Sequence, residues 1–366
     1  FAENGKRQVS SLHEVILSVG IDIGTSTTQL IFSQLTIENR ASSYTVPRID
    51  IVDKEVVYRS KIYFTPLKSP TEIDAEAVKN IVREEYRAAG KSPKDVRTGA
   101  VIITGETARK QNANEVLEAL SDLAGDFVVA TAGPDLESVL AARGAGTDSQ
   151  SHDRRTVAAN LDIGGGTSNI GLYEKGILRG TSCLDIGGRL IKVENGKITY
   201  VFSKTQHLAA VHGIALKVGD RADIQVLSSV CTLMANQLAQ ALYLTEPDGD
   251  HAELYTNHGK PLPREPRVRA VTFSGGVADC IYQAPEGDPF RYGDVGILLG
   301  KAIRDNPDFR TVEILPAAET IRATVVGAGI HTTEVSGSTI HYDQDQLPIK
   351  NIPILKVSEE DEESLE

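Results

Sequence analysis

The hydrophobic positions along the chain alternate between runs of strand length and stretches with helical spacing. An apolar run at 15–21 ends in Asp22-Ile-Gly24 and a second run follows at 29–32, which predicts two buried strands joined in a hairpin. Further apolar runs predict strands at 100–103, 127–131, 177–184, 198–202 and 268–273. Periodic stretches predict helices at 106–125, 134–143, 220–244, 294–304 and 321–332. This mixture is typical of an α/β protein.

Two further observations concern helices. Thr71-Glu-Ile-Asp74 resembles a capping box, and the apolar positions that follow it at near-helical spacing up to Gly90 are Ile73, Ala77, Ile81 and Tyr86. The helix at 220–244 carries a stripe that we assign to core packing, formed by Ile224, Leu227, Val230, Met234 and Leu238.

The opening pattern occurs a second time. Residues 160–172 repeat the pattern of 20–32 without gaps, and each copy reads as a strand, an acidic glycine turn and a strand. The aligned pairs are Asp22 with Asp162, Gly24 with Gly164, Thr27 with Thr167 and Gln29 with Asn169. An internal duplication at this separation predicts two similar domains that face each other.

We therefore expect a first domain at 15–145 and a second at 156–335, separated by the small, polar segment 144–155. Residues 336–366 are expected to begin a C-terminal segment and to end in a solvated acidic tail, truncated at the last residue. Because the chain starts at Phe1 and its only methionine is Met234, we expect the native start to lie upstream.

Composition excludes several classes of protein. The 38 Lys and Arg residues against 50 Asp and Glu give a net charge of −12, which argues against a surface for nucleic acid. The longest apolar runs, such as 99–105, are far shorter than a membrane span. The three cysteines, Cys183, Cys231 and Cys280, are too far apart for a CxxC metal or redox motif, so we expect packing roles and a reducing cytoplasm.

Three glycine turns carry the candidate chemistry. Residues 22–28 and 162–168 each place a carboxylate at a strand end, followed by glycines and hydroxyl residues whose N–H groups can bind a phosphate. Each carboxylate would lie near a Mg²⁺ ion on those phosphates. The third turn, 273–279, leads from a strand into a helix and allows flat contact with a nucleoside. No Walker P-loop, GxGxxG, HExxH or GxSxG motif is present.

These residues resemble a known superfamily. The turns Asp22-Ile-Gly-Thr25, Asp162-Ile-Gly-Gly-Gly-Thr167 and Ser274-Gly-Gly276 are similar to the two phosphate motifs and the adenosine motif of the actin, Hsp70 and sugar-kinase superfamily. About residues 15–355 resemble the ethanolamine ammonia-lyase reactivating factors, most clearly at 17–24, 102–108, 125–130, 134–138 and 323–329.

The resemblance implies a fold and a function. The fold would be a pair of duplicated actin-like (ribonuclease H-like) ATPase domains that face each other across a nucleotide cleft. The function would be that of a chaperone-like factor, a slow Mg²⁺-dependent ATPase that binds ATP and ADP. Its partner would be the inactivated ethanolamine ammonia-lyase holoenzyme, from which it releases damaged cobalamin so that intact adenosylcobalamin can bind. A cytoplasmic location associated with the ethanolamine-utilisation microcompartment is also implied, with no nucleic-acid or membrane partner.

The resemblance also assigns roles to individual residues. The phosphates would be held by Asp22, Gly24, Thr25, Ser26 and Thr27 from one domain and by Asp162, Gly164, Gly165, Gly166 and Thr167 from the other. The adenosine would be faced by Ser274, Gly275, Gly276 and Asp279. Asp22 and Asp162 would organise Mg²⁺ through waters, and Thr104 and Glu106 would sit near the metal or the attacking water.

One departure from the superfamily leaves alternatives open. Hsp70 proteins carry a lysine in the cleft that assists hydrolysis, and no lysine here matches it, so we expect slow turnover. A small-molecule kinase of the same fold would need a carboxylate that accepts a proton from the substrate, for which Asp135 or Asp185 is the candidate. A filament-forming protein is a third possibility. An iron–sulfur activator is disfavoured, because none of the cysteines is placed for a shared cluster.

Overall fold

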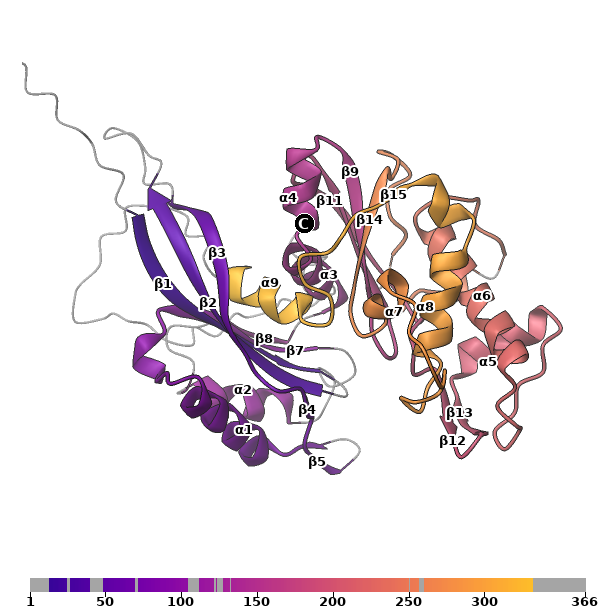
Figure 1. The fold of residues 1–366 in the computed structure, drawn as a ribbon, viewed down its shortest axis with the longest axis horizontal. Helices are drawn as coiled ribbons and strands as arrows, with labels where there is room; N and C mark the ends of the chain where they lie inside the picture. The colour runs from indigo at the N-terminus through magenta and orange to yellow at the C-terminus, as the bar shows by residue number, and fades with distance from the viewer. Residues whose placement is uncertain are drawn as a thin grey trace, which may run out of the picture.

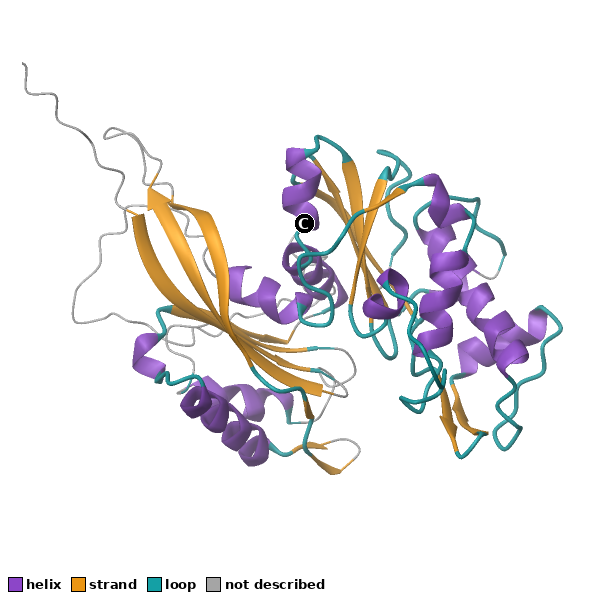
Figure 2. Cartoon of the chain, viewed as in Figure 1, coloured by secondary structure: helices purple, strands orange, loops and turns teal. Residues whose placement is uncertain are grey.

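The computed structural model describes residues 13–24, 27–39, 49–69, 72–104, 112–121, 123, 128–131, 133–249, 251–256 and 260–331. They form two bodies, each built around one β-sheet, with a pair of helices between the sheets (Figure 1). We call the body around the first sheet the first lobe and the other the second lobe. Figure 2 shows the two sheets as separate groups of strands, and most helices of the second lobe lie on its outer side.

The first sheet has the order β3-β2-β1-β7-β8, with β4 paired to β2. Its strands are β1 (His13–Ile23), β2 (Thr27–Asn39), β3 (Ile49–Arg59), β4 (Tyr63–Phe64), β7 (Thr98–Ile103) and β8 (Val128–Thr131). A small separate ladder pairs β5 (Leu67–Ser69) with β6 (Glu72–Ile73). β1, β2 and β3 are antiparallel neighbours, whereas β7 and β8 run parallel to β1.

The second sheet repeats this arrangement in the order β11-β10-β9-β14-β15. Its strands are β9 (Val157–Ile163), β10 (Ser168–Glu174), β11 (Ile177–Leu184), β14 (Ala270–Ser274) and β15 (Glu313–Ile314). A hairpin of β12 (Ile191–Glu194) and β13 (Lys197–Val201) stands apart. The first three strands are again antiparallel and the last two again parallel to the central strand. The duplicated, actin-like α/β fold predicted from the sequence is confirmed.

The helices cover both sheets. They are α1 (Ala75–Ala88), α2 (Ala113–Ser121), α3 (Pro134–Gly144), α4 (Thr147–Asp153), α5 (Ser203–Val211), α6 (Ile224–Ala241), α7 (Ala278–Tyr282), α8 (Gly296–Asp305) and α9 (Ala323–His331). α1 and α2 lie on one face of the first sheet and α9 lies on the other (Figure 1). No helix among the described residues is long and apolar enough to cross a membrane.

The two lobes exchange a helix at their junction. α3 follows the last strand of the first sheet but packs on β9, β10 and β11, whereas α9 follows the second sheet but packs on β1, β2 and β7. The two helices cross closely, because a Cβ on Gly327 would lie 1.8 Å from Leu140 O and one on Gly144 would lie 1.7 Å from Ala323 O. α3 and α9 thus each pack on the sheet of the other lobe. The domain boundaries 15–145 and 156–335 stay a prediction.

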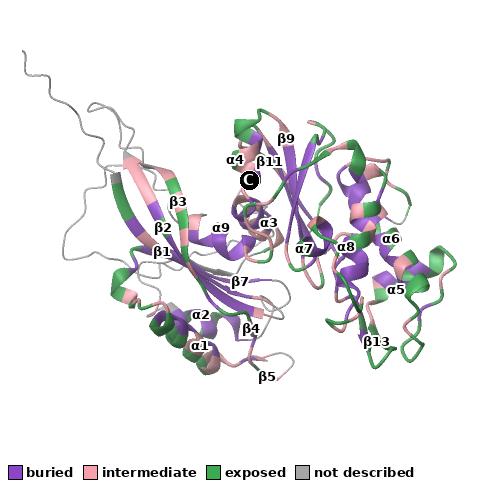
Figure 3. Ribbon diagram, viewed as in Figure 1, coloured by how far each residue is buried: buried purple, intermediate pink, exposed green. Residues whose placement is uncertain are grey.

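Buried residues are concentrated in the central strands of both sheets and in α3, α6, α8 and α9 (Figure 3). The stripe predicted on α6 is buried at Leu227, Val230, Met234 and Leu238. Ile224 is 51% exposed and the prediction is wrong there, because it is the first residue after the N-cap Asp223 and precedes the face that meets the core.

The helix predicted up to Gly90 is confirmed as α1 and Tyr86 is buried, but the predicted start is wrong, and Ala77 and Ile81 are only partly buried. Asp74 is the N-cap, since its carboxylate accepts a hydrogen bond from the N–H of Ala77 at 3.0 Å, so the helix begins after it and Ile73 belongs to β6. The buried face of the helix is formed by Val78, Val82, Glu85 and Tyr86.

Candidate functional site

Two buried carboxylates mark the candidate site. Asp22 stands near the end of β1 and Asp162 near the end of β9, the central strand of each sheet. Their side chains share a sheet face with Gly20 and Asn160, which is the face that α9 covers in the first lobe. The charge on Asp162 contributes to raising the pKa of Asp22. The two carboxylates therefore occupy equivalent positions on the two central strands.

Each carboxylate accepts a hydrogen bond from a hydroxyl on the neighbouring parallel strand. Thr104 Oγ1, just after β7, donates to Asp22 Oδ1 at 3.0 Å. Ser274 Oγ, at the end of β14, donates to Asp162 Oδ1 at 2.6 Å. The duplication thus extends from the backbone to the local surroundings of both acids.

Burial dominates the electrostatics of this pair. It raises the pKa of Asp22 to about 7 and that of Asp162 to about 6, against the lowering effect of the hydroxyl donors. Without a cation, both acids therefore titrate close to neutral pH. A divalent cation between them would favour the ionised forms.

The two phosphate turns are closed by the same backbone hydrogen bond. Gly24 N donates to Thr27 O at 2.8 Å, and Gly164 N donates to Thr167 O at 2.9 Å. In the first lobe, the carbonyl of Gly24 also accepts a hydrogen bond from Thr65 Oγ1 at 2.7 Å. Thr25, Ser26 and Glu106 lie outside the described residues.

A segment that the sequence analysis missed supports the second turn. Gly188 N donates to Gly164 O at 3.0 Å, and Arg189 N donates to Gly165 O at 2.7 Å. A Cβ on Gly187 would lie 2.4 Å from Gly165 O, so this close contact requires glycine. The signal was available, because 185–188 spells Asp-Ile-Gly-Gly, a third copy of the acidic glycine pattern.

The third turn lies beside the second. Gly275 has φ +84°, and a Cβ on it would lie 2.5 Å from Ile163 O, so the turn needs glycine here. Gly276 is exposed, as is Asp279 on α7, whereas Ser274 is buried with its hydroxyl directed at Asp162. The assignment of this turn to adenosine stays a prediction.

Two amide side chains lie next to the carboxylates and offer further oxygen atoms as metal ligands. Gln29 pairs across the hairpin with Asp22, and Asn169 pairs with Asp162. Both are buried, and their amide oxygens have no hydrogen-bond partner among the described residues. The sequence alignment had matched these two positions but assigned them no role. Carboxylate and amide oxygens are ligands that suit Mg²⁺, so these residues fit that ion.

Few protein ligands are available to hold a metal on their own. Within the described part of the chain, no three His, Cys, Asp or Glu side chains lie close enough to share an ion. Mg²⁺ commonly binds through one or two carboxylates together with substrate phosphates and waters, which is what Asp22 and Asp162 offer.

The residues that the alternative functions would need are engaged elsewhere. Asp185 accepts a hydrogen bond from Lys204 Nζ at 2.6 Å, and Asp135 accepts one from Thr181 Oγ1. The three cysteines are buried and unpaired, as predicted for packing residues.

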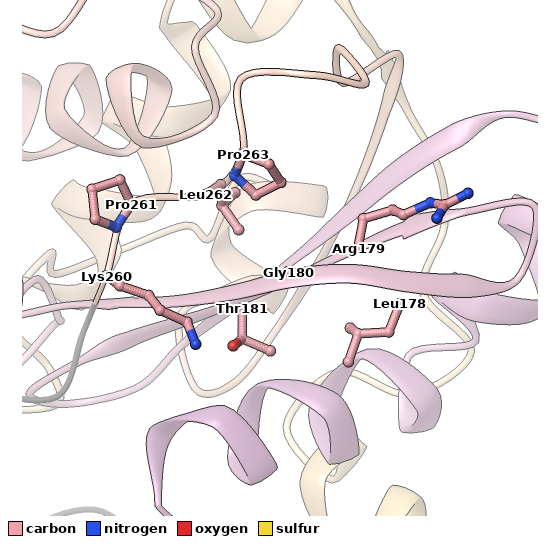
Figure 4. Close-up of a pocket in the computed structure, with 8 residues that line it drawn as sticks. All are labelled: Leu178, Arg179, Gly180, Thr181, Lys260, Pro261, Leu262 and Pro263. Atoms are coloured by element: carbon pink, nitrogen blue, oxygen red, sulfur yellow. The ribbon is translucent and has the colours of Figure 1, made fainter. Parts of the chain in front are cut away.

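A hollow of about 520 Å³ lies away from the paired carboxylates. It lies between strand β11 and a loop of the second lobe. Its lining is formed by residues 178–181 and 260–263 (Figure 4). None of the three glycine turns contributes to it. The site at the lobe junction is therefore defined by its polar groups.

Comparison with known proteins agrees with this geometry. The family model described as "Ethanolamine utilisation protein EutA" matches residues 14–366. Two similar proteins are named "Ethanolamine ammonia-lyase reactivase EutA". The one from Escherichia coli is 40% identical over 351 residues, and the one from Salmonella typhimurium is 41% identical over 341 residues. Each alignment covers 93% of this chain and 72% of the relative.

The fold is also similar to a solved structure. A Ppx/GppA family member from Aquifex aeolicus matches with a TM-score of 0.50 and 13% identity, covering 87% of this chain and 98% of the other. At that identity the match supports the fold alone. The resemblance noted in the sequence is confirmed by the family model and the curated relatives, and the chain belongs to the ethanolamine utilisation protein EutA family.

Proposed function

We propose that this protein is an ATP-dependent reactivating factor for ethanolamine ammonia-lyase. It binds the inactivated holoenzyme and releases damaged cobalamin, so that intact adenosylcobalamin can enter. Membership of the EutA family and the names of the two relatives support the partner. The observation that supports the ATP dependence is the pair of glycine turns closed by the same hydrogen bond, each next to a buried carboxylate.

The chain's own groups give each part of the nucleotide a place. The backbone N–H groups of the turns that begin at Gly24 and Gly164 bind the terminal phosphates from opposite sides. Asp22 and Asp162 would hold Mg²⁺ through waters, and Gln29 and Asn169 would offer amide oxygens next to them. Mg²⁺ supplies positive charge that offsets the charge of the phosphates. The turn at Gly275 receives the adenosine.

Slow turnover follows from the same arrangement. Hydrolysis of a phosphate anhydride depends on positioning and electrostatic stabilisation, and Asp22 and Asp162 already accept hydrogen bonds from Thr104 and Ser274. Lys204, on α5, is paired with Asp185. ATP would therefore serve mainly as a ligand held by groups of both lobes. We place the protein in the cytoplasm, associated with the ethanolamine-utilisation microcompartment.

Reactivation of the lyase tests this function. The protein is incubated with ethanolamine ammonia-lyase that has been inactivated with cyanocobalamin, together with free adenosylcobalamin, ATP and Mg²⁺, and ammonia release is followed. We expect activity to return only when ATP and Mg²⁺ are both present. Controls omit the protein, replace ATP with AMP, or chelate the metal. Recovery that is equal without nucleotide would contradict the ATP-dependent reactivase.

A further inference from the structure

Arg189 lies across the second phosphate turn. Its backbone N–H holds the carbonyl of Gly165, and its methylene groups cover the same residue, since a Cβ on Gly165 would lie 3.2 Å from Arg189 Cδ. The side chain of Arg189 therefore runs over the turn that is assigned to a phosphate.

A single buried carboxylate orients the guanidinium. Arg189 Nε donates to Asp294 Oδ2 at 3.3 Å, and the other carboxylate oxygen of Asp294 accepts a hydrogen bond from Gly296 N, at the start of α8, at 2.9 Å. The side chain of Asp294 is only 10% exposed, whereas that of Arg189 is 37% exposed. Among the described residues Asp294 is the one partner of this guanidinium, so both Nη groups are available to a ligand.

The segment that carries Arg189 also reaches toward the nucleoside turn. A Cβ on Gly188 would lie 2.9 Å from Gly296 Cα and 3.2 Å from Cγ2 of Val277, which directly follows the glycines of the third turn. On its other side, Gly187 contacts Gly165. Arg189 thus stands between the turn for the phosphates and the turn for the nucleoside.

A positively charged side chain is needed here to offset the negative charge of the site and of a nucleotide. Asp22 and Asp162 are both acidic, the protein has a net charge of −12, and Lys204 is held by Asp185. A nucleotide would bring further negative charge to the same site. An arginine presents a planar fork of donors that matches a phosphate, and it keeps its charge at any pH that the protein encounters.

We propose that Arg189 binds the phosphates nearest the ribose, which ATP and ADP share, and that Asp294 positions it. This inference rests on the proposed function, because it assigns a contact within the nucleotide site. Binding through these phosphates keeps ADP in place after hydrolysis, while the terminal phosphate is left to the two glycine turns.

Calorimetric titration of Arg189→Met with ADP, ATP–Mg²⁺ and adenosine tests the assignment. We expect Kd to rise about tenfold to a hundredfold for both nucleotides, the effect of losing a charge-assisted hydrogen bond, and to stay unchanged for adenosine. Arg189→Lys keeps the charge but loses the fork, so its Kd should be intermediate. The matched control is Arg179→Met, because Arg179 is 42% exposed, pairs with the single carboxylate of Glu174 and lies on β11, away from the turns.

The outcomes separate this inference from the function on which it rests. If the wild-type protein binds neither ATP nor ADP, the proposed ATP dependence fails and the inference fails with it. If the wild type binds both nucleotides and Arg189→Met binds them within about twofold of it, only the role of Arg189 is wrong. A parallel loss for adenosine also overturns that role, because it would reflect distortion of the turn. Should Arg189→Met fail to fold, the same comparison is made with Arg189→Lys.

Discussion

At the scale of single residues, the paired carboxylates relate stability to function. Asp22 and Asp162 are buried acids whose folded-state pKa values, about 7 and about 6, lie well above the ordinary value of 3.8. Between the ordinary pKa of 3.8 and the raised values, the folded state binds more protons than the unfolded state. The free energy of unfolding therefore falls as pH rises through that range. The ligand-free protein is therefore destabilised at neutral pH by the buried carboxylates of its site.

Asp22→Asn should remove part of this destabilisation. At about pH 8 we expect the ligand-free variant to be more stable than the wild type by on the order of 1–3 kcal/mol, because an uncharged amide replaces a buried carboxylate. The advantage should disappear toward about pH 4, where Asp22 is protonated. Thermal unfolding across this pH range measures it, and reactivation of the lyase should be lost. A variant that is less stable at every pH would show that the carboxylate is a structural cap.

Thr104→Val removes the hydroxyl that donates to Asp22 while keeping the shape of the side chain. We expect it to lower the free energy of unfolding by on the order of 1–3 kcal/mol at about pH 8, because a buried carboxylate loses a donor. Thr104→Ser retains the hydroxyl and serves as the control. Denaturant unfolding of the three proteins gives the comparison, and equal losses for Val and Ser would assign the effect to packing instead of the hydrogen bond.

At the scale of elements, the crossing of α3 and α9 depends on glycine. Gly327→Ala would place a Cβ 1.8 Å from the carbonyl oxygen of Leu140, which belongs to the backbone and cannot move aside alone. We expect a loss of about 1–3 kcal/mol or more in the free energy of unfolding, since the helices must separate. Gly133→Ala, at the start of α3, is the control because nothing lies within 4 Å of its added Cβ. Equal effects of the two changes on the melting temperature would contradict the close crossing.

The elements that were predicted correctly share one property. The hairpin strands β1 and β2, and their repeats β9 and β10, contain short apolar runs on either side of an acidic glycine turn, so their pattern is local and readable. β3 was not predicted, because its apolar residues alternate with charged ones and the strand is half-exposed at the sheet edge. The start of α1 was misplaced, because the choice between Thr71 and Asp74 as cap depends on packing that the sequence does not display.

The candidate site was predictable only in part. Asp22, Asp162 and their turns stood out because they are duplicated within one sequence. Arg189 and Asp294 are 105 residues apart and form no local motif, so only the folded chain brings them together. The roles of Gln29 and Asn169 likewise depend on cross-strand register, which became readable once the hairpins were in place.

At the scale of the whole molecule, the two lobes should respond together to nucleotide. ATP with Mg²⁺ should stabilise the protein by about 2.7 kcal/mol at a hundredfold excess over Kd, which thermal unfolding detects as a raised melting temperature. AMP should have a much smaller effect, because it lacks the terminal phosphates that the paired turns bind. ADP should fall between them. Equal shifts for AMP and ATP would mean that the turns do not bind phosphate.

Coupling to the lyase must be reciprocal. Whatever factor ATP applies to the affinity for the inactivated lyase, the lyase must apply to the affinity for ATP. Titrating ATP with and without the cobalamin-bound lyase measures one side, and titrating lyase with and without ATP measures the other. ATP turnover should not respond to a panel of sugars, polyols or short acids. A phosphorylated small molecule, with no effect of the lyase on ATP affinity, would favour a kinase.

The exchanged helices have a consequence for how the protein is made. The inner face of the first sheet, including Ile31 and Ile102, is covered by Val325 and Ala328 of α9, which lies more than two hundred residues further along the chain. During synthesis the first lobe therefore leaves the ribosome early, yet its apolar surface stays bare until the second lobe has been translated. The lobe that is made first is completed last. Newly made chains are thus most prone to aggregation during that interval, and the lobes reach their final packing as one cooperative unit.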